Sequence, residues 1–307
     1  MNKKPLMYVI ISAALFGIST PLAKVLVADI QPVALAGLLY FGAFLGLLLL
    51  GMTKKMVPST KVIVSTPLER RDLPWLGGAI LAGGIIAPIA LMTGLTMVSG
   101  FASSLLLNLE GVATAIIAVF IFKEYAGRRI WLALVIMTLA GVSLSWNTSR
   151  GELNLAGPIL IVFAMTCWGI DNNLTKKISN KDPVQIALIK GMIAGTVLLL
   201  LAFILGIRIP LDSTMIYALI LGSLSYGVSI VLFIKGLEGI GACRTGAFYS
   251  FGPFVGAIVS ILVLGETVSW ALLIATLLMV AGVWIMVTDK HGYLYKHTSI
   301  MHKHAHN

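Results

Sequence analysis

Residues 183–206 read PVQIALIKGMIAGTVLLLLAFILG, an apolar run in which Lys190 is the only charged residue. At a rise of about 1.5 Å per residue, a helix of about 20 such residues crosses the roughly 30 Å hydrocarbon core of a bilayer. The run begins with a proline, which suits the first turn of a helix. This stretch therefore predicts a transmembrane helix that carries one buried cation.

Similar runs recur along the chain. Of its 307 residues, 58% are hydrophobic and 11% are charged, and the mean hydropathy is +0.99. A water-soluble domain could not bury so much apolar surface. We therefore predict an all-α integral membrane protein with ten transmembrane helices. They span residues 6–27, 32–51, 74–97, 100–122, 128–147, 155–178, 183–206, 213–237, 242–264 and 269–288.

The 22 Lys and Arg residues are distributed unevenly between the two sides of this arrangement. With the amino terminus in the cytoplasm, nearly all loop cations lie inside, and only Lys24, Arg150 and Arg208 lie outside. Because positive loops are retained in the cytoplasm, we expect a multi-pass protein of the cytoplasmic (inner) membrane with both termini inside. The net charge of +10 then reflects topology, and no nucleic-acid partner is expected.

The two halves of the sequence resemble each other. The Phe-Gly-Ile of residues 16–18 matches the Trp-Gly-Ile of residues 168–170 at an offset of 152 positions. Further on, Lys123-Glu124 matches Gly265-Glu266 at an offset of 142 positions. Residues 1–148 and 149–288 are therefore predicted to be two five-helix repeats.

Five is an odd number of helices, so the second repeat must enter the membrane in the opposite direction. Inverted repeats of this kind place a solute site near the midplane and permit alternating access. Residues 289–307 form a polar tail that contains all five histidines, and we expect this cytoplasmic tail to be disordered.

These features resemble the drug/metabolite transporter superfamily, specifically its EamA-type members. The resemblance rests on the inverted repeat, on the Phe/Trp-Gly motifs followed by Lys24 and Lys176, and on the glutamates Glu124 and Glu266. It covers essentially residues 5–288. It implies a secondary transporter that exports a small metabolite, amino acid-like solute or drug. Many members carry an arginine in the second helix of a half, where this chain has residues 39–41 (Leu-Tyr-Phe) and Lys190.

Three charged residues lie deep within predicted helices, where an unpaired charge is costly. Asp171 and Lys190 are each about seven residues, or roughly 10 Å, from the inner ends of consecutive helices. Both a static ion pair and a contact with solute or a coupling proton fit these two residues. Glu110 lies about twelve residues, or roughly 18 Å, from the inner end of its helix, close to the midplane. We favour a functional role for Glu110.

Other polar residues accompany these charges. Ser103 and Thr114 are expected on the same helix face as Glu110, and Asn108 on a neighbouring stripe. Asp171, Asn172 and Asn173 cannot all point one way at 100° per residue, so at least one should hold a neighbouring helix. The predicted solute-binding residues are Glu110, Asn108, Asp171, Asn172, Asn173, Lys190, Tyr226 and Tyr249.

Two other functions were weighed: a membrane-embedded enzyme and a non-transporting subunit of a membrane complex. The predicted helices contain no histidine, the loops are short, and the chain has no Gly-x-Ser-x-Gly motif. No Walker A pattern occurs, so ATP-driven pumping by this chain is not expected. We therefore predict a transporter that is not an enzyme and needs no cofactor or metal. Its partners are a small-molecule solute, the lipid bilayer and, as a candidate, protons, and both a monomer and a homodimer fit.

Overall fold

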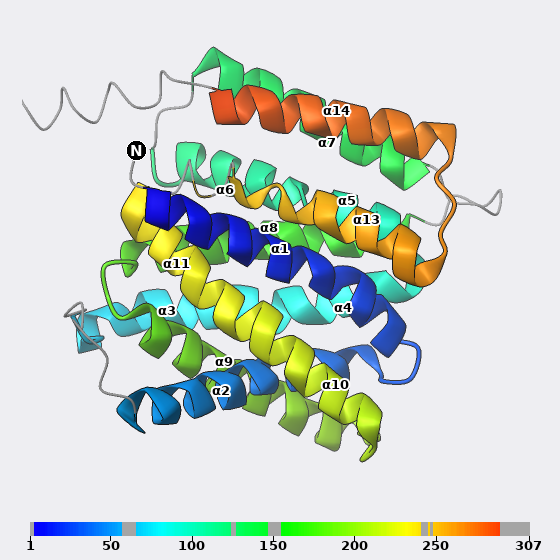
Figure 1. The fold of residues 1–307 in the computed structure, drawn as a ribbon. Coiled ribbons are helices and arrows are strands. Elements are labelled where there is room, and N and C mark those ends of the chain that lie inside the picture. Colours follow the sequence, from blue (N-terminus) through cyan, green and yellow to red (C-terminus); the bar gives the residue numbers. More distant parts are fainter. Residues whose placement is uncertain are drawn as a thin grey trace, which may run out of the picture.

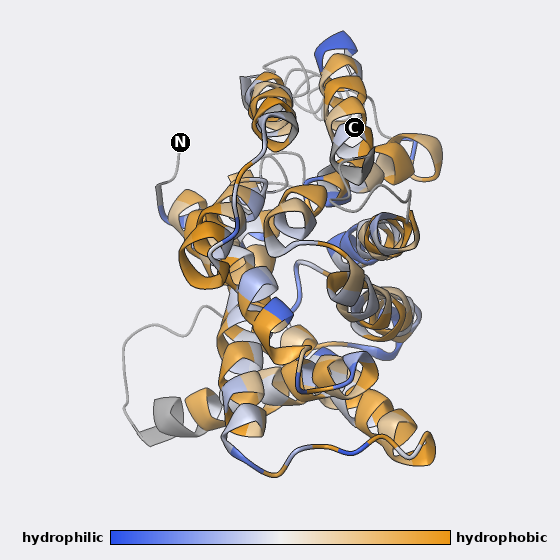
Figure 2. Cartoon of the chain, turned by 90° about the vertical axis from the view of Figure 1, so that its right-hand side faces the viewer, coloured by the Kyte–Doolittle hydropathy of each residue, from blue (hydrophilic) through white to orange (hydrophobic). Residues whose placement is uncertain are grey.

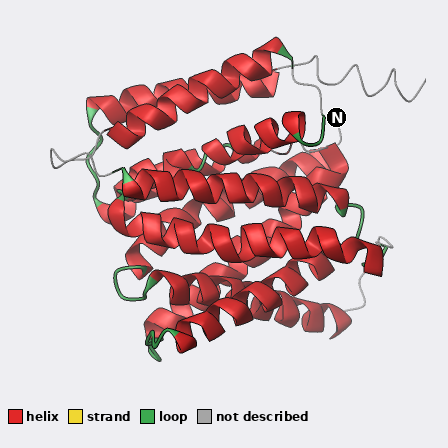
Figure 3. Cartoon of the chain, turned by 180° about the vertical axis from the view of Figure 1, so that it is seen from behind, coloured by secondary structure: helices red, strands yellow, loops and turns green. Residues whose placement is uncertain are grey.

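The protein was analysed as a computed structural model, which describes residues 3–56, 66–123, 127–146, 155–240, 245 and 248–288. These residues form helices joined by loops (Figure 3). Among them, the only bridge of β type joins Thr66 to Lys181. The boundary between residues 148 and 149, Glu124, and the tail 289–307 lie outside the described residues.

Within these residues, helix is found in each of the predicted stretches. Six helical runs are long and apolar enough to cross a membrane, and Gly252–Leu264 and Leu272–Ile285 are shorter apolar helices. The elements are α1 (Lys3–Leu26), α2 (Pro32–Met56), η1 (Arg70–Asp72), α3 (Leu73–Ala79), η2 (Ile80–Ile86), α4 (Ala87–Met97), α5 (Gly100–Leu106), α6 (Leu109–Phe120), α7 (Arg128–Trp146), α8 (Ala156–Lys177), α9 (Pro183–Ile204), α10 (Ser213–Gly222), η3 (Ser223–Val228), α11 (Ser229–Ile240), α13 (Gly252–Leu264) and α14 (Trp270–Thr288).

The helices lie side by side in one bundle (Figure 1). At one edge α2 packs against α9, and at the opposite edge α7 packs against α14. Between these pairs, α1 packs against α11 and α13, and α8 packs against α4 and α6. The middle of the bundle therefore contains two groups of helices, one around α1 and one around α8.

Glycines permit the closest helix crossings. A Cβ atom on Gly252 would lie 2.6 Å from the carbonyl oxygen of Ala13, and one on Gly256 would lie 2.6 Å from that of Gly17. Real Cβ atoms essentially never come so near another atom. The contact between α1 and α13 therefore depends on the small residues of a Gly-x-x-x-Gly motif, as is common between membrane helices.

Two helical runs contain a widened, π-helical turn at matching places. At the end of η2, the N–H of Ala87 bonds to the carbonyl of Ala82, five residues back. At the end of η3, the N–H of Ser229 bonds to the carbonyl of Leu224, again five residues back. The two turns are separated by 142 positions, the offset found in the sequence. Such turns interrupt the regular ladder and often mark functional positions.

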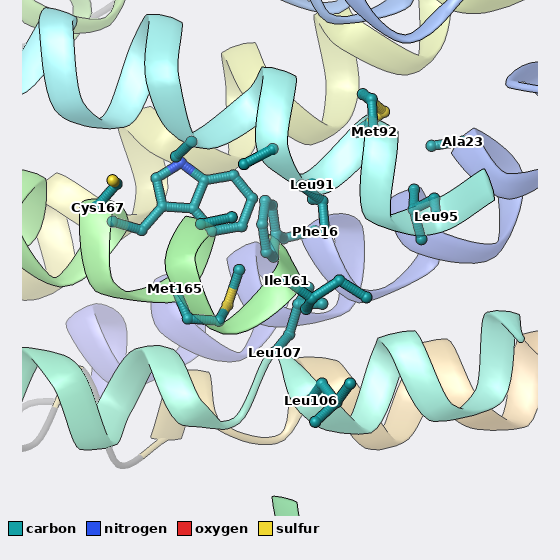
Figure 4. Close-up of a cluster of buried hydrophobic side chains, with 14 of the residues drawn as sticks. Phe16, Ala23, Leu91, Met92, Leu95, Leu106, Leu107, Ile161, Met165 and Cys167 are labelled. Atoms are coloured by element: carbon teal, nitrogen blue, oxygen red, sulfur yellow. The ribbon is translucent and has the colours of Figure 1, made fainter. Parts of the chain in front are cut away.

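Hydrophobic residues fill the interior and also cover the outside of the bundle. Figure 4 shows the interior, where labelled side chains such as Phe16 of α1, Leu91 of α4 and Ile161 of α8 gather. On the outside, Phe203 is 79% exposed and Leu262 is 78% exposed. Much of the length of the helices is hydrophobic in Figure 2. An apolar exterior of this extent suits contact with lipid.

Candidate functional site

A cavity lies between the two middle groups of helices. The space within it that no atom fills, counting the part open to solvent, is about 510 Å³. Its walls combine aromatic and aliphatic side chains with a few polar and charged ones. The lining residues are Phe16, Tyr40, Glu110, Trp168, Asp171, Asn172, Thr175, Lys190, Tyr226, Ile230, Phe233, Ile234 and Tyr249.

An ion pair forms part of this wall. Lys190 of α9 donates to Oδ2 of Asp171 on α8, and Thr175 Oγ1 donates to Asp171 Oδ1 at 2.9 Å. All three side chains are buried. The expected approach of Asp171 and Lys190 is therefore confirmed, and each charge satisfies the other away from water.

The carboxylate of Glu110, at the start of α6, has a neutral hydrogen-bond partner. The amide of Asn172 donates to Glu110 Oε1 at 2.7 Å and to Thr114 Oγ1 at 3.2 Å. Within the described part of the chain, no Lys, Arg or His forms a salt bridge with Glu110. Its carboxylate thus lines the cavity with an amide partner and without a basic one.

Two of the predicted site residues lie elsewhere. Asn173 donates to the carbonyl oxygens of Thr114 at 3.0 Å and Gly169 at 2.8 Å, so it holds α8 against α6. Asn108 donates to Met279 Sδ at 3.4 Å, toward α14. Neither residue lines the cavity.

Ser103 does not line the cavity with Glu110, although the sequence predicted a shared face. The helix is interrupted between α5, which ends at Leu106, and α6, which begins at Leu109. Ser103 is buried on the far side of this interruption and is absent from the cavity wall. Counting at 100° per residue fails here because it assumes an unbroken helix. Thr114, which lies in the same helix as Glu110, does share its partner Asn172.

Aromatic side chains surround Phe16 at the centre of the bundle. The Phe16 ring centroid lies 5.3 Å from that of Trp168, 5.7 Å from that of Tyr226 and 5.5 Å from that of Tyr249. Tyr249 also lies 4.7 Å from Phe233, centroid to centroid. Tyr226 and Tyr249 were predicted at the site from the sequence. In the sequence, Phe16 and Trp168 mark the repeat, and their equivalent positions in two helices are the signal that could identify them as site residues.

The widened turn η2 holds two aromatic residues of the cavity wall, Tyr40 and Trp168. In a regular α-helix the N–H of Ala87 would bond to the carbonyl of Gly83, but here it bonds to Ala82 instead. The freed Gly83 oxygen accepts hydrogen bonds from Tyr40 OH at 2.7 Å and Trp168 Nε1 at 2.9 Å. The role of Tyr40 and Gly83 was missed because a π turn has no simple sequence signature.

Polar contacts also join the bundle near the start of α5. The Glu266 carboxylate accepts from the N–H groups of Gly100 at 2.7 Å and Phe101 at 2.6 Å, at the start of α5. Nearby, Lys24 of α1 donates to the carbonyl of Leu95 on α4. These contacts join the group around α1 to the group around α8.

A second polar cluster lies at the opposite end, in the loops before α3 and α9. Lys181 Nζ lies 2.6 Å from Glu69 Oε1 and 3.4 Å from Asp72 Oδ2. The hydrogen bond from Lys181 lowers the pKa of Glu69, and the same bond raises the pKa of Lys181. The backbone N–H of Leu68 also donates to Gln185 Oε1 at 3.0 Å. The sequence had indicated these charges only as loop residues that set topology.

Known proteins similar to this chain point to one family. The EamA-like transporter family matches residues 3–146 and 155–288. A protein of Methanothermobacter thermautotrophicus, described as an uncharacterized transporter, is 29% identical over 289 residues, which is 91% of this chain and 84% of that protein. A protein of known crystal structure shares the fold with a TM-score of 0.67 and 14% identity, over 92% of this chain and 94% of that one. The chain is therefore a multi-pass membrane protein that belongs to the EamA-like transporter family.

Proposed function

We propose that this protein is a secondary transporter that moves a small solute across the cytoplasmic membrane by alternating access, in the direction of export. The observation that carries the proposal is the cavity between the two middle groups of helices. It brings a carboxylate that forms no salt bridge among the described residues, a buried ion pair and an aromatic wall to one place. Ionisable groups at such depth are costly and usually serve a transport pathway. The proposed solute contacts are Glu110, Asn172, Tyr226, Tyr249 and the pair of Asp171 and Lys190.

Ten spans in two inverted repeats are part of this proposal, and three observations support them. The widened turns η2 and η3 match at the offset of 142 positions. Lys123 and Gly265, separated by the same offset, both adopt positive φ angles, of 56° and 64°. The packing also matches, because α1 packs against α11 and α13 while α8 packs against α4 and α6. Two copies of one unit would give this pattern.

The arrangement of contacts supports a conformation open to the cytoplasm. Glu266 and Lys24 join the two groups of helices at the end that the distribution of charge assigns to the outside. Thr175 of α8 and Ile234 of α11 line the cavity. Both residues lie toward the carboxyl-terminal ends of their helical runs, which the distribution of charge assigns to the cytoplasm. Rocking the two groups about this site would open the other side.

Transport by the purified protein in liposomes tests the proposal. Amino acids, amines and other small metabolites are loaded as radiolabelled mixtures, and their release is measured with wild-type protein, with Glu110→Gln and with Glu238→Gln. Glu238 is an exposed residue of α11 and serves as the matched control. We expect release with wild-type protein and Glu238→Gln, and a rate lower by about tenfold or more with Glu110→Gln, since bonds to charged groups contribute about 1.5–3 kcal/mol. No release of any solute by the wild-type protein would contradict the proposed function.

A further inference from the structure

Hydrogen-bond donors at the cavity wall are largely engaged within the protein. Lys190 donates to Asp171. Tyr40 and Trp168 both donate to the carbonyl of Gly83. An anionic group that bound to Lys190, Tyr40 or Trp168 would have to break one of these bonds, and breaking the ion pair would leave a buried charge without its partner.

The acidic groups of the cavity wall are engaged less completely than the donors. Asp171 is neutralised by Lys190, so an ionised Glu110 leaves this part of the wall with one unbalanced negative charge. Asn172 supplies one N–H to Glu110 Oε1, and no described residue is recorded as a donor to Oε2. Glu110 is only partly buried, while Asp171 and Lys190 are buried. The open acceptor at this site is therefore a carboxylate oxygen.

Aromatic rings surround the same space. Phe16, Trp168, Tyr226, Phe233 and Tyr249 all line the cavity together with Glu110. The negative face of an aromatic ring attracts a cation within about 6 Å of its centroid, and this attraction grows when water is excluded. The rings also provide apolar surface for the body of a solute. The Glu110 carboxylate and the aromatic rings thus both favour a positive charge on the solute.

We propose that the solute is an organic cation, a protonated or quaternary amine attached to an apolar body, which binds with its charged nitrogen beside Glu110 and within the aromatic wall. This inference rests on the proposed transport function and specifies its substrate class. Zwitterions are disfavoured, because their carboxylate would lie where the Lys190 ammonium is already engaged with Asp171. A neutral solute would leave an ionised Glu110 without a counter-charge.

Binding to the full chain in lipid nanodiscs tests the charge preference. The probes are phenethylamine and benzyltrimethylammonium as cations, 3-phenylpropionate as the anion of similar size, and phenylalanine as the zwitterion. Isothermal titration calorimetry gives each dissociation constant. We expect either cation to bind at least about tenfold more tightly than the anion and the zwitterion. Equal or tighter binding of 3-phenylpropionate, or no binding of either cation at millimolar concentration, would overturn the proposal.

Glu110→Gln and the exposed control Glu238→Gln then locate the charge that is responsible. The first should weaken cation binding about tenfold to hundredfold, and the second should leave it unchanged. Undiminished cation binding by a folded Glu110→Gln protein would overturn the assignment to Glu110. The comparison of probes on the wild-type protein decides the charge preference even if this variant does not fold. Transport of a neutral or anionic solute in liposomes, without cation binding, would reject this inference and leave the proposed transport function standing.

Discussion

Asp171, Lys190 and Glu110 share one cavity, but their charges are balanced in different ways. The ammonium of Lys190 and the hydroxyl of Thr175 both donate to Asp171, and these groups are buried. Glu110 receives only the neutral amide of Asn172 among the described residues. The pair is therefore satisfied within the wall, and we propose that Glu110 is the main charged contact of the solute.

The pair should show strong coupling in a double-mutant cycle. Asp171→Asn or Lys190→Met alone leaves one buried charge without its partner, and we expect a loss of about 3–5 kcal/mol in the free energy of unfolding. The double variant removes both charges and should lose less than either single variant. Equilibrium unfolding in mixed micelles measures this coupling. Losses that simply add would show that the two charges do not depend on each other.

The level that two side chains share along neighbouring helices was easier to predict from the sequence than the direction in which a side chain points. The rise of a helix gives the depth of a charge from residue counting, so the contact between Asp171 and Lys190 could be expected. The predicted direction of Asn108 was wrong, because this residue lies in the turn between α5 and α6 and its side chain donates to Met279. All three successive polar residues in α8 bond to a neighbouring helix: Asp171 to α9, and Asn172 and Asn173 to α6. Assigning each residue to its partner required the positions of α6 and α9.

At the scale of elements, the sequence predicts the helices better than the details that hold them in place. Continuous apolar runs predicted the helical segments, but no pattern in residues 80–86 predicted the widened turn of η2. The contacts before α3 were also not foreseen, since loop charges are usually solvated. There the N–H of Asp182 bonds to the carbonyl of Thr66 at 3.1 Å, and Lys181 bonds to Glu69. These contacts attach the segment before α3 to the loop between α8 and α9.

Lys181→Met should release this segment without unfolding the bundle. We expect faster hydrogen–deuterium exchange, read by mass spectrometry, in the peptide that contains Leu68 and Asp72. Lys177→Met is the control, because Lys177 instead lies 4.9 Å from the ring centroid of Phe122. Equal exchange in both variants would show that Lys181 does not hold the segment.

The pH range of this contact follows from the two shifted groups. The pKa of Glu69 is below its usual 4.5, so its contribution is present above that value and is lost as pH falls through the lowered pKa. The pKa of Lys181 is above its usual 10.5, so its contribution is lost only as pH rises through the raised pKa. Protection of the wild-type peptide, corrected for the intrinsic exchange rate, should stay constant between about pH 6 and about pH 9.

At the scale of the whole molecule, the proposed repeat of the two halves is not matched by a repeat of the charges. At the offset of 142 positions Glu110 corresponds to Gly252, and at the offset of 152 positions Asp171 corresponds to Ser19. The first repeat thus supplies one acid from α6, and the second supplies the ion pair from α8 and α9. In the proposed mechanism, two similar halves would rock between two conformations, while the unequal charges would give the solute one preferred orientation.

The contacts of Glu266 and Lys24 should determine which side of the cavity is closed. In a background with Cys167 and Cys243 replaced by alanine, Phe233→Cys places a thiol at the cavity wall. We expect a membrane-impermeant maleimide to label this thiol faster from the cytoplasmic side than from the outside. Leu211→Cys, at an 87% exposed position before α10, is the control for outside access.

Adding Glu266→Gln tests the closure itself. The charged carboxylate accepts two backbone N–H groups at the start of α5, and charge-assisted bonds of this kind contribute about 1.5–3 kcal/mol each. Weakening them lowers the stability of the conformation closed at that end relative to the alternative one. Labelling of Phe233→Cys should therefore become faster from the outside and slower from the cytoplasm, a change of opposite sign on the two sides. A variant with unchanged rates on both sides would show that Glu266 does not hold the bundle closed, and faster labelling on both sides would indicate general loosening instead of a shift between two conformations.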